Sequence, residues 1–196
     1  FKGLKQANKP DKLNVSLEES TLIRLLVLYG TYPLDFEYEN EDGETEITTL
    51  YCATFIMSEL AVDQIEFSDT IFKKIYLEFT QRFETDETIL NDKHFIQHSD
   101  PEISQAASEF LSQKHELSDW GKKEIFVPTE KEKLFDLVNE GVIRLKSKQV
   151  KLKIEGMLLR MKNNEVIGDE RSKFMALFQQ LNELSMIIDK KLGREC

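Results

Sequence analysis

The chain has 196 residues and a formal net charge of −10, which argues against a surface that binds nucleic acid or membranes over its whole extent. A chain of this length forms one large domain or two small ones and buries about 70% of its unfolded surface, so we expect a substantial core. Because 40% of the residues are apolar and only 8 are Gly and 4 are Pro, helix-forming residues dominate and a mostly helical fold is expected.

The N-terminal segment, residues 1–15, is polar, and the chain begins with Phe1 rather than Met. We therefore interpret this segment as a linker from an upstream region. Ser16 and Glu19 have the spacing of a capping box, which predicts the start of the first helix, and Gly30 predicts its end.

An acidic segment follows, with seven acidic side chains in the twelve positions 35–46. Like-charge repulsion and the lack of a helical apolar pattern predict a solvated loop there. The next apolar pattern, at helical spacing, predicts a second helix over residues 47–61.

The third helix is expected to begin after Ser68, which can act as its N-cap. A short helical turn is predicted over 92–97, and Asp100 followed by Pro101 predicts the start of another helix. Residues 118–128 form a connection with the only tryptophan of the chain. The third helix carries a broad aromatic and aliphatic stripe that we expect in the core, formed by Ile71, Ile75, Tyr76, Phe79 and Phe83.

The last third of the chain is expected to differ in shape from the rest. Thr129 and Glu132 form a second capping box, and no strong stop appears before Asn163, so a helix of about 34 residues and about 51 Å is predicted. This exceeds the diameter of about 42 Å of a compact globule of this size, so the helix should overhang the body. A final helix over 170–192 must fold back on it.

These patterns predict an all-α fold, in which a helical bundle is followed by a long helix and a C-terminal antiparallel helical hairpin. We expect the bundle to comprise residues 16–128 and the long helix with its hairpin residues 129–196. The second part contains 14 basic and 11 acidic residues, a net charge of +3, so the first part carries −13. The two parts are therefore expected to face different surroundings.

A basic stretch in the long helix has seven basic residues against one acid over 19 positions. An ordinary solvated surface, contact with an acidic protein partner and direct binding to DNA all remain open for it. The basic residues are Arg144, Lys146, Lys148, Lys151, Lys153, Arg160 and Lys162.

Motifs for catalysis or metal binding are weak. His94 and His98 are four residues apart and could share a helix face, but the accompanying ligands of zinc sites are missing at the expected spacings. No glycine-rich phosphate loop or nucleophile elbow is present. Cys52 and Cys196 are too few for a disulfide framework or a four-thiolate zinc site. We therefore expect no catalytic residue, no metal and no small-molecule substrate.

The compartment is expected to be the cytoplasm, with no membrane partner. No run of about 18 apolar residues is present, and the N-terminus has no apolar core of a signal peptide.

The closing hairpin carries more apolar side chains than one helix–helix interface can bury. Consecutive apolar residues, such as 157–159 and 186–188, point to several sides of their helices. The surplus must pack either on the bundle or on another protein, and we expect a second protein.

Four segments resemble, in this order, the C-terminal region of bacterial DnaG-type DNA primases. They are LIRLLVLYG (22–30), FIMSELAVDQIEF (55–67), HFIQHSDPEISQAASEFLSQKHELSDWGKK (94–123) and LFQQLNELSMIIDKKLGR (177–194). The resemblance implies a non-catalytic domain that docks on the N-terminal domains of a DnaB-type hexameric helicase. Zinc and magnesium are then expected only in upstream domains.

The partner-binding residues are expected on the last helix. Spacings of three and four place an apolar group on one face, which could fit a groove between partner helices, with two polar residues at its rim. Gly141, inside the long helix, is predicted to be a hinge, although an ordinary tolerated helix glycine is an open alternative. The expected face consists of Phe178, Leu181, Ser185 and Ile188, with Asn182 and Lys191 at the rim. Some of these residues are expected to pack within the hairpin instead, against Leu152, Met157 or Leu159.

Overall fold

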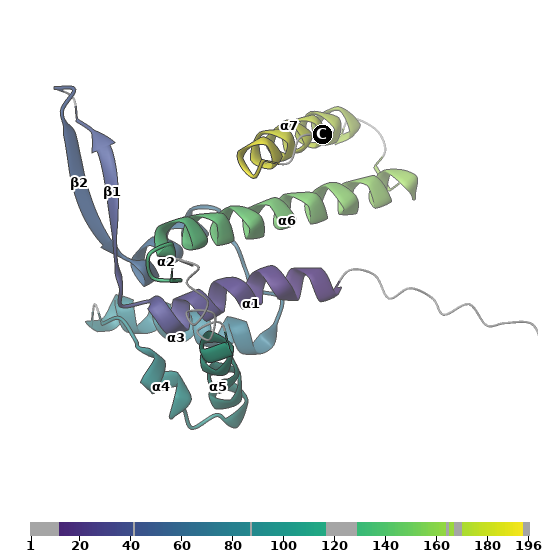
Figure 1. Ribbon diagram of the computed structural model, residues 1–196. Coiled ribbons are helices and arrows are strands. Elements are labelled where there is room, and N and C mark those ends of the chain that lie inside the picture. The colour runs from purple at the N-terminus through teal and green to yellow at the C-terminus, as the bar shows by residue number, and fades with distance from the viewer. Residues whose placement is uncertain are drawn as a thin grey trace, which may run out of the picture.

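The computed structural model describes residues 12–40, 42–86, 88–116, 129–163, 165–166 and 170–193. These residues form seven helices and one two-stranded antiparallel sheet (Figure 1). The fold is mostly helical, as expected, but the sheet shows that it is not purely all-α. The elements are α1 (Lys12–Tyr29), β1 (Pro33–Glu39), β2 (Thr45–Tyr51), α2 (Cys52–Val62), α3 (Thr70–Asp86), α4 (Asp92–Ile96), α5 (Pro101–Glu116), α6 (Leu134–Lys162) and α7 (Glu170–Lys191).

Helix α1 is the centre of the body and contacts α2, α3, α4, α5 and α6. Its second half is apolar on almost every side, and a helix of this kind must be covered all round. The helices α3, α4 and α5 lie on one side of α1, while α6 lies on the other, with α7 beyond α6 (Figure 1). Buried on α1 are Leu22, Ile23, Leu25, Leu26, Val27, Leu28 and Tyr29.

The predicted start of the first helix is wrong. Helix α1 begins at Lys12, within the segment expected to be a linker. Glu19 does not cap its own helix. It is fully buried and its carboxylate accepts hydrogen bonds from the backbone N–H and hydroxyl of Ser68, at 2.8 and 2.9 Å, and from the N–H of Asp69 at 3.1 Å. Glu19 thus joins α1 to the start of α3.

The acidic segment forms a β-ribbon instead of a loop, and α2 begins only at Cys52. Strands β1 and β2 pair in antiparallel register from Pro33 with Tyr51 to Glu39 with Thr45. Cross-strand hydrogen bonds engage the acids: Thr49 donates to Asp35 at 2.6 Å and Tyr38 to Glu46 at 2.5 Å. These bonds offset the charge repulsion that predicted a loop.

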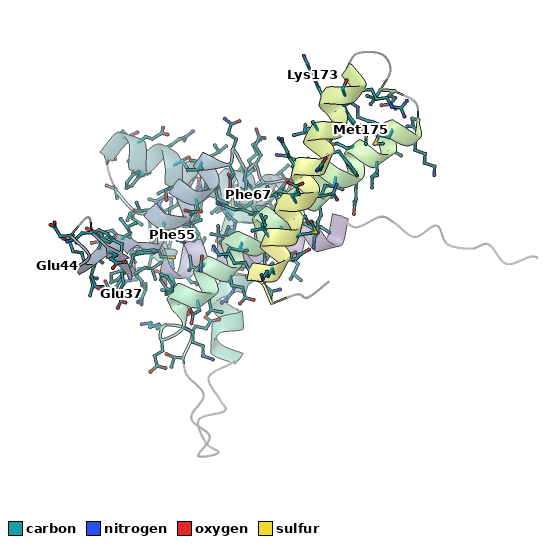
Figure 2. The ribbon with its side chains drawn as sticks, turned by 90° about the horizontal axis from the view of Figure 1, so that it is seen from above. Glu37, Glu44, Phe55, Phe67, Lys173 and Met175 are labelled. Carbon is teal, nitrogen blue, oxygen red and sulfur yellow. The ribbon has the colours of Figure 1, made fainter. Side chains whose placement is uncertain are left out.

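The ribbon is attached to the body through aromatic rings at its base. The ring centroid of Phe36 lies 4.9 Å from that of Phe55 on α2 and 5.2 Å from that of Phe135 on α6. Beyond this base the ribbon extends away from the helices (Figures 1 and 2).

The next elements follow the predictions with one shift. Asp69, rather than Ser68, caps α3, because its Oδ1 accepts from the N–H groups of Ile71 and Phe72. The predicted turn at α4 and the Asp100–Pro101 start of α5 are confirmed. The expected stripe on α3 lies in the core or packs against it. Trp120 and the connection 118–128 lie outside the described residues.

The turn that precedes α6 is tied to α1. The Thr129–Glu132 capping box forms, with the Thr129 N–H donating to Glu132 at 2.7 Å. Between these two residues, the Glu130 carboxylate accepts from the guanidinium of Arg24 at 2.8 Å and from the hydroxyl of Tyr29 at 2.6 Å.

Helix α6 itself begins only at Leu134, with Lys133 as its N-cap, so the predicted start is wrong by about four residues and the helix has 29 residues rather than about 34. The capping box closes a turn over residues 130–133 that is not α-helical. Among the described residues, no helix combines the length and apolarity needed to cross a membrane.

Candidate interaction surface on the helical hairpin

Helices α6 and α7 form an antiparallel hairpin, as predicted. The Nζ of Lys151, in the middle of α6, lies 2.8 Å from Oδ1 of Asp189 near the end of α7. At the other end of the pair, the guanidinium of Arg160 lies 5.2 Å from the ring centroid of Phe174. Within the hairpin, α7 lies on the side of α6 that is turned away from α1 (Figure 1).

The two helices of the hairpin pack against each other through one row of side chains on each helix, which we call the inner seam. The residues of a seam are three and four positions apart, which is the spacing that brings two helices together with interlocking side chains. The inner seam of α6 consists of Ser147, Val150, Ile154, Met157 and Met161, all buried or half-buried. The inner seam of α7 consists of Phe174, Phe178, Leu181, Ser185, Ile188 and Leu192, all half-buried.

Most of the predicted partner-binding residues lie in this inner seam. Phe178, Leu181, Ser185 and Ile188 are half-buried, and Lys191 is exposed. Asn182 is half-buried, and its amide donates a hydrogen bond to the carbonyl oxygen of Phe178 at 2.7 Å. The four seam residues pack within the hairpin, and their contact with a partner stays a prediction.

Other apolar side chains of the hairpin are exposed. Several are half or more accessible to solvent, including Leu177 at 50% and Ile187 at 65%. Scattered exposed apolar residues are common on protein surfaces, but a group on one projecting element indicates a contact with another molecule. Apart from Phe135 at the base of α6, the exposed large apolar residues of the two helices are Leu158, Leu159, Met175, Leu177, Leu184, Met186 and Ile187.

Gly141 is packed against α1. It lies buried within the continuous helix α6, and a Cβ atom there would be 3.4 Å from Cδ1 of Leu22 and 3.7 Å from Cδ1 of Leu25. The small residue lets α6 approach α1 closely. The predicted hinge therefore gains no support from the packing.

The basic stretch of α6 is largely engaged within the chain. Lys146 pairs with Glu59 at 2.6 Å and with Asp63 at 2.8 Å. Burial lowers the pKa of Lys146, but the hydrogen bonds to these two carboxylates outweigh it, so the pKa is raised. Lys151 pairs with Asp189, and Arg144 pairs with Glu140 on its own helix. These pairs reduce the positive charge available to a DNA backbone.

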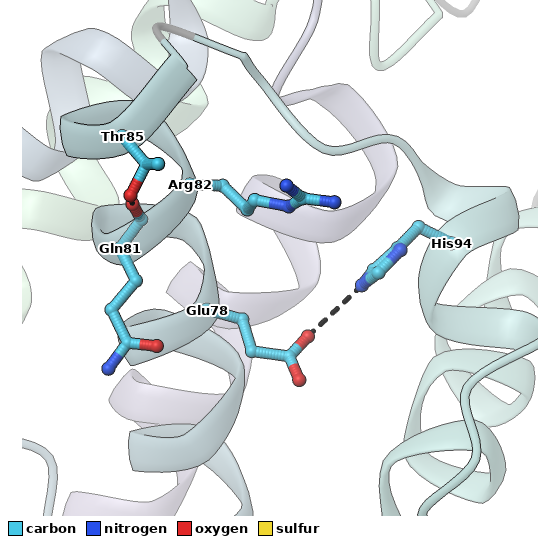
Figure 3. Close-up of a pocket in the computed structure, with 5 residues that line it drawn as sticks. All are labelled: Glu78, Gln81, Arg82, Thr85 and His94. Atoms are coloured by element: carbon cyan, nitrogen blue, oxygen red, sulfur yellow. Dashed lines mark hydrogen bonds and ion pairs between the residues drawn. The ribbon is translucent and has the colours of Figure 1, made fainter.

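The two histidines meet a carboxylate next to a pocket. The pocket has a volume of about 330 Å³ and is lined by Glu78, Gln81, Arg82, Thr85 and His94 (Figure 3). Nε2 of His94 lies 3.1 Å from one carboxylate oxygen of Glu78, and Nε2 of His98 lies 2.8 Å from the other. The three ligand atoms lie within 4.8 Å of one another, as at a three-ligand zinc site.

The hydrogen bonds of His98 oppose metal binding there. Its Nδ1 accepts from the backbone N–H of Asp100 at 3.0 Å, so the proton of the neutral ring is on Nε2, which donates to Glu78. A metal at Nε2 requires the opposite tautomer, with Nδ1–H as a donor. We therefore interpret this group as a structural contact that joins α3 to α4 and to the start of α5.

Sequence reasoning missed the buried polar residues that hold the elements together. Asp189 is only 8% exposed, and Ser147 and Lys151 both contact it across the hairpin. Glu19 and Glu130 make similar long-range contacts. Nothing in the local sequence distinguishes these carboxylates from solvated ones, because their partners are tens of residues away. Cys52 is fully buried, and burial raises the pKa of its thiol to about 12, which makes the thiol unreactive.

A family model matches residues 5–195, nearly the whole chain, and the family is described as a domain of unknown function, DUF8430. No curated protein and no solved structure matches the chain. The extent of the match indicates that the body and the hairpin occur together as one unit in the family.

Proposed function

The chain belongs to the DUF8430 family, and we propose that it is a non-catalytic docking module, which attaches a bacterial replicative primase to the N-terminal domains of a DnaB-type hexameric helicase. The projecting hairpin of α6 and α7 is the docking element in this proposal. The body, with α1 at its centre, holds the hairpin in place.

The observation that carries the proposal is the exposed apolar surface of the hairpin. Helix α6 is about 43 Å long, and only part of it packs on the body. Helix α7 packs along α6 on the outer side (Figure 1). Both helices retain exposed leucines, among them Leu159 at 59% and Leu177 at 50%. A protein partner that covers these side chains removes apolar surface from water, which favours binding by about 25 cal/mol per Å².

The choice of partner is supported by the resemblance of four ordered segments to the C-terminal region of DnaG-type primases. The resemblance is strongest over residues 94–128, of which the structure describes 94–116, and it also covers most of the closing helix. The proposal assigns no primer synthesis to this chain. It also assigns DNA binding no primary role, because Lys146 and Lys151 are paired with acids of the chain itself.

The test is calorimetric titration of the whole chain with the N-terminal domain of the cognate helicase. Point variants are preferable to cutting the chain after Asn163, because the cut would expose the inner seam, including the buried Val150 and Met157. The double variant Leu177→Asp with Leu184→Asp should lose most of the affinity, since charges replace apolar contacts.

A matched control lies on the β-ribbon, where Ile47 is 65% exposed, an apolar side chain as accessible as those of the hairpin. Ile47→Asp should bind the helicase domain as the unmodified chain does. Absence of binding by the unmodified chain, or an equal loss in Ile47→Asp, contradicts the proposal. Circular dichroism of each variant verifies that the helices are intact.

A further inference from the structure

Helix α7 carries a second seam beside the inner one. Each of its residues directly precedes a residue of the inner seam, so the spacing is again four and three. All six residues of this second seam are exposed. We name it the outer seam, and it consists of Lys173, Leu177, Gln180, Leu184, Ile187 and Lys191.

The apolar part of the outer seam has the form that a partner helix recognises. Leu177, Leu184 and Ile187 are 50%, 42% and 65% exposed and repeat at heptad spacing. In a coiled coil, such positions insert between side chains of a facing helix. The polar Gln180 stands among them, and a polar residue at a seam position sets the register of helix pairing.

A basic residue stands at each end of the outer seam. Lys173 and Lys191 are 18 positions apart, which corresponds to about 27 Å along a helix. Figure 2 shows Lys173 on the side of α7 opposite Met175, near the outer end of the hairpin. A facing helix therefore meets a positive charge at each end of the apolar part.

The end charges disfavour a second copy of this chain as the occupant. Two antiparallel copies joined through the outer seam would place Lys173 opposite Lys191, and two parallel copies would place each lysine opposite itself. Both arrangements bring like charges together. A different partner, with acidic residues at these places, is complementary.

We propose that the outer seam binds one amphipathic helix of the partner protein, with apolar residues at spacings of three and four and acidic residues about 27 Å apart at its two ends. This inference rests on the proposed docking function and specifies the face and the form of the partner. The inner seam, in contrast, remains buried between α6 and α7 when the partner binds.

Adjacent residues of α7 supply matched variants for the test. Met186 is 58% exposed and precedes Ile187, but lies outside the outer seam, about 100° round the helix. Ile187→Asp should weaken binding to the helicase N-terminal domain by at least about tenfold, and Met186→Asp by less than about twofold. Lys191→Glu should likewise weaken binding more than Lys190→Glu, since Lys190 is also exposed but lies off the seam.

The outcomes separate this inference from the proposed function. If the unmodified chain binds the helicase domain but the two members of each pair behave alike, the outer-seam inference is overturned and docking by the hairpin stands. If a dimer of the chain forms in sedimentation experiments and Ile187→Asp dissolves it, a second copy is the occupant and the inference is likewise overturned.

If the unmodified chain does not bind the helicase domain, the proposed function fails, and a synthetic peptide then tests the outer seam alone. The probe is an amphipathic helix of about three heptads with leucines at the seam positions and glutamates at both ends. Binding to the unmodified chain that is lost in Ile187→Asp and kept in Met186→Asp supports the outer seam. Absence of binding overturns it.

Discussion

The Nζ of Lys151 lies 2.8 Å from Oδ1 of Asp189, and this ion pair joins the middle of α6 to the end of α7. The Asp189 side chain is 11% exposed and that of Lys151 is 38% exposed, so the pair is only partly screened by water. Because the pair is charged within a mostly apolar interface, it favours one register of the hairpin. The register, in turn, decides which residues of α7 face outward.

Loss of the Asp189 carboxylate should loosen the hairpin. Asp189→Ala leaves Lys151 without its partner at the edge of the interface, and we expect a loss of about 1–2 kcal/mol, reduced from the value for a fully buried pair. Hydrogen exchange of the α7 amides measures it. Glu183→Ala, at an exposed position of the same helix, should change the exchange by less than about 0.5 kcal/mol. Equal effects of the two variants would contradict the role of the ion pair.

Replacement of Glu19 should destabilise the body. Glu19→Ala removes the acceptor of three hydrogen bonds from Ser68 and Asp69 and leaves a cavity beside them. A loss of about 2–4 kcal/mol in the free energy of unfolding is expected, measured by urea denaturation. Glu37→Gln on the exposed ribbon is the control, with a change below about 0.5 kcal/mol. A loss no larger than that of the control would show that the contact contributes nothing.

The two glycines of α6 should respond differently to alanine. A Cβ atom added at Gly156 would have no neighbour within 4 Å outside its own helix, so Gly156→Ala should stabilise the helix by about 0.5–1 kcal/mol. At Gly141 the added Cβ atom would lie at the limit of ordinary contact with Leu22, so any adjustment of Leu22 reduces the gain, and a smaller stabilisation is expected. Thermal unfolding of both variants tests this. If Gly141→Ala is as stabilising as Gly156→Ala, close packing is not the reason for that glycine.

The thiol of Cys52 should be inert in the folded protein. Burial raises its pKa from 9.0 to about 12, so at pH 8 very little thiolate is present. In a Cys196→Ser background, an aromatic disulfide reagent should react slowly with the native chain and quickly after denaturation. Fast reaction of the native chain would contradict the burial of this side chain.

The raised pKa of the Cys52 thiol also implies that the stability of the fold depends on pH. Since the thiol in the unfolded chain releases its proton near pH 9 and the buried thiol near pH 12, the folded state holds the proton more tightly. The contribution of Cys52 to stability is therefore complete below pH 9 and is lost progressively as the pH rises toward 12. Cys52→Ala should therefore make the free energy of unfolding fall less steeply between pH 9 and pH 12.

The helices could be predicted where the signal is local. The Asp100–Pro101 pair marks the start of α5, and the heptad spacing marks α7 almost to its last residue. The β-ribbon could not be predicted from charge, because the cross-strand bonds of Asp35 and Glu46 that offset the repulsion exist only after the strands pair. The alternation of Leu34, Phe36 and Tyr38 was the available signal, since a period of two is typical of a strand.

The proposed docking face could be predicted from the sequence only as far as the helix that carries it. The inner and outer seams of α7 differ by one residue throughout, and both contain apolar side chains. Their sequence patterns do not say whether Leu181 or Gln180 faces α6. That choice is made by long-range contacts such as Lys151 with Asp189, 38 residues apart. The capping-box spacing of Ser16 and Glu19 gave a wrong helix start for the same reason, since Glu19 accepts a hydrogen bond from a residue 49 positions away.

Hydrogen exchange of the whole chain, with and without the helicase N-terminal domain, shows directly whether the hairpin docks on a partner protein. If the hairpin is the docking element, added helicase domain slows exchange in α7 and in the outer half of α6, and leaves exchange in the β-ribbon and α3 unchanged. Unchanged exchange in α7, or protection confined to the ribbon or the body, would contradict docking by the hairpin.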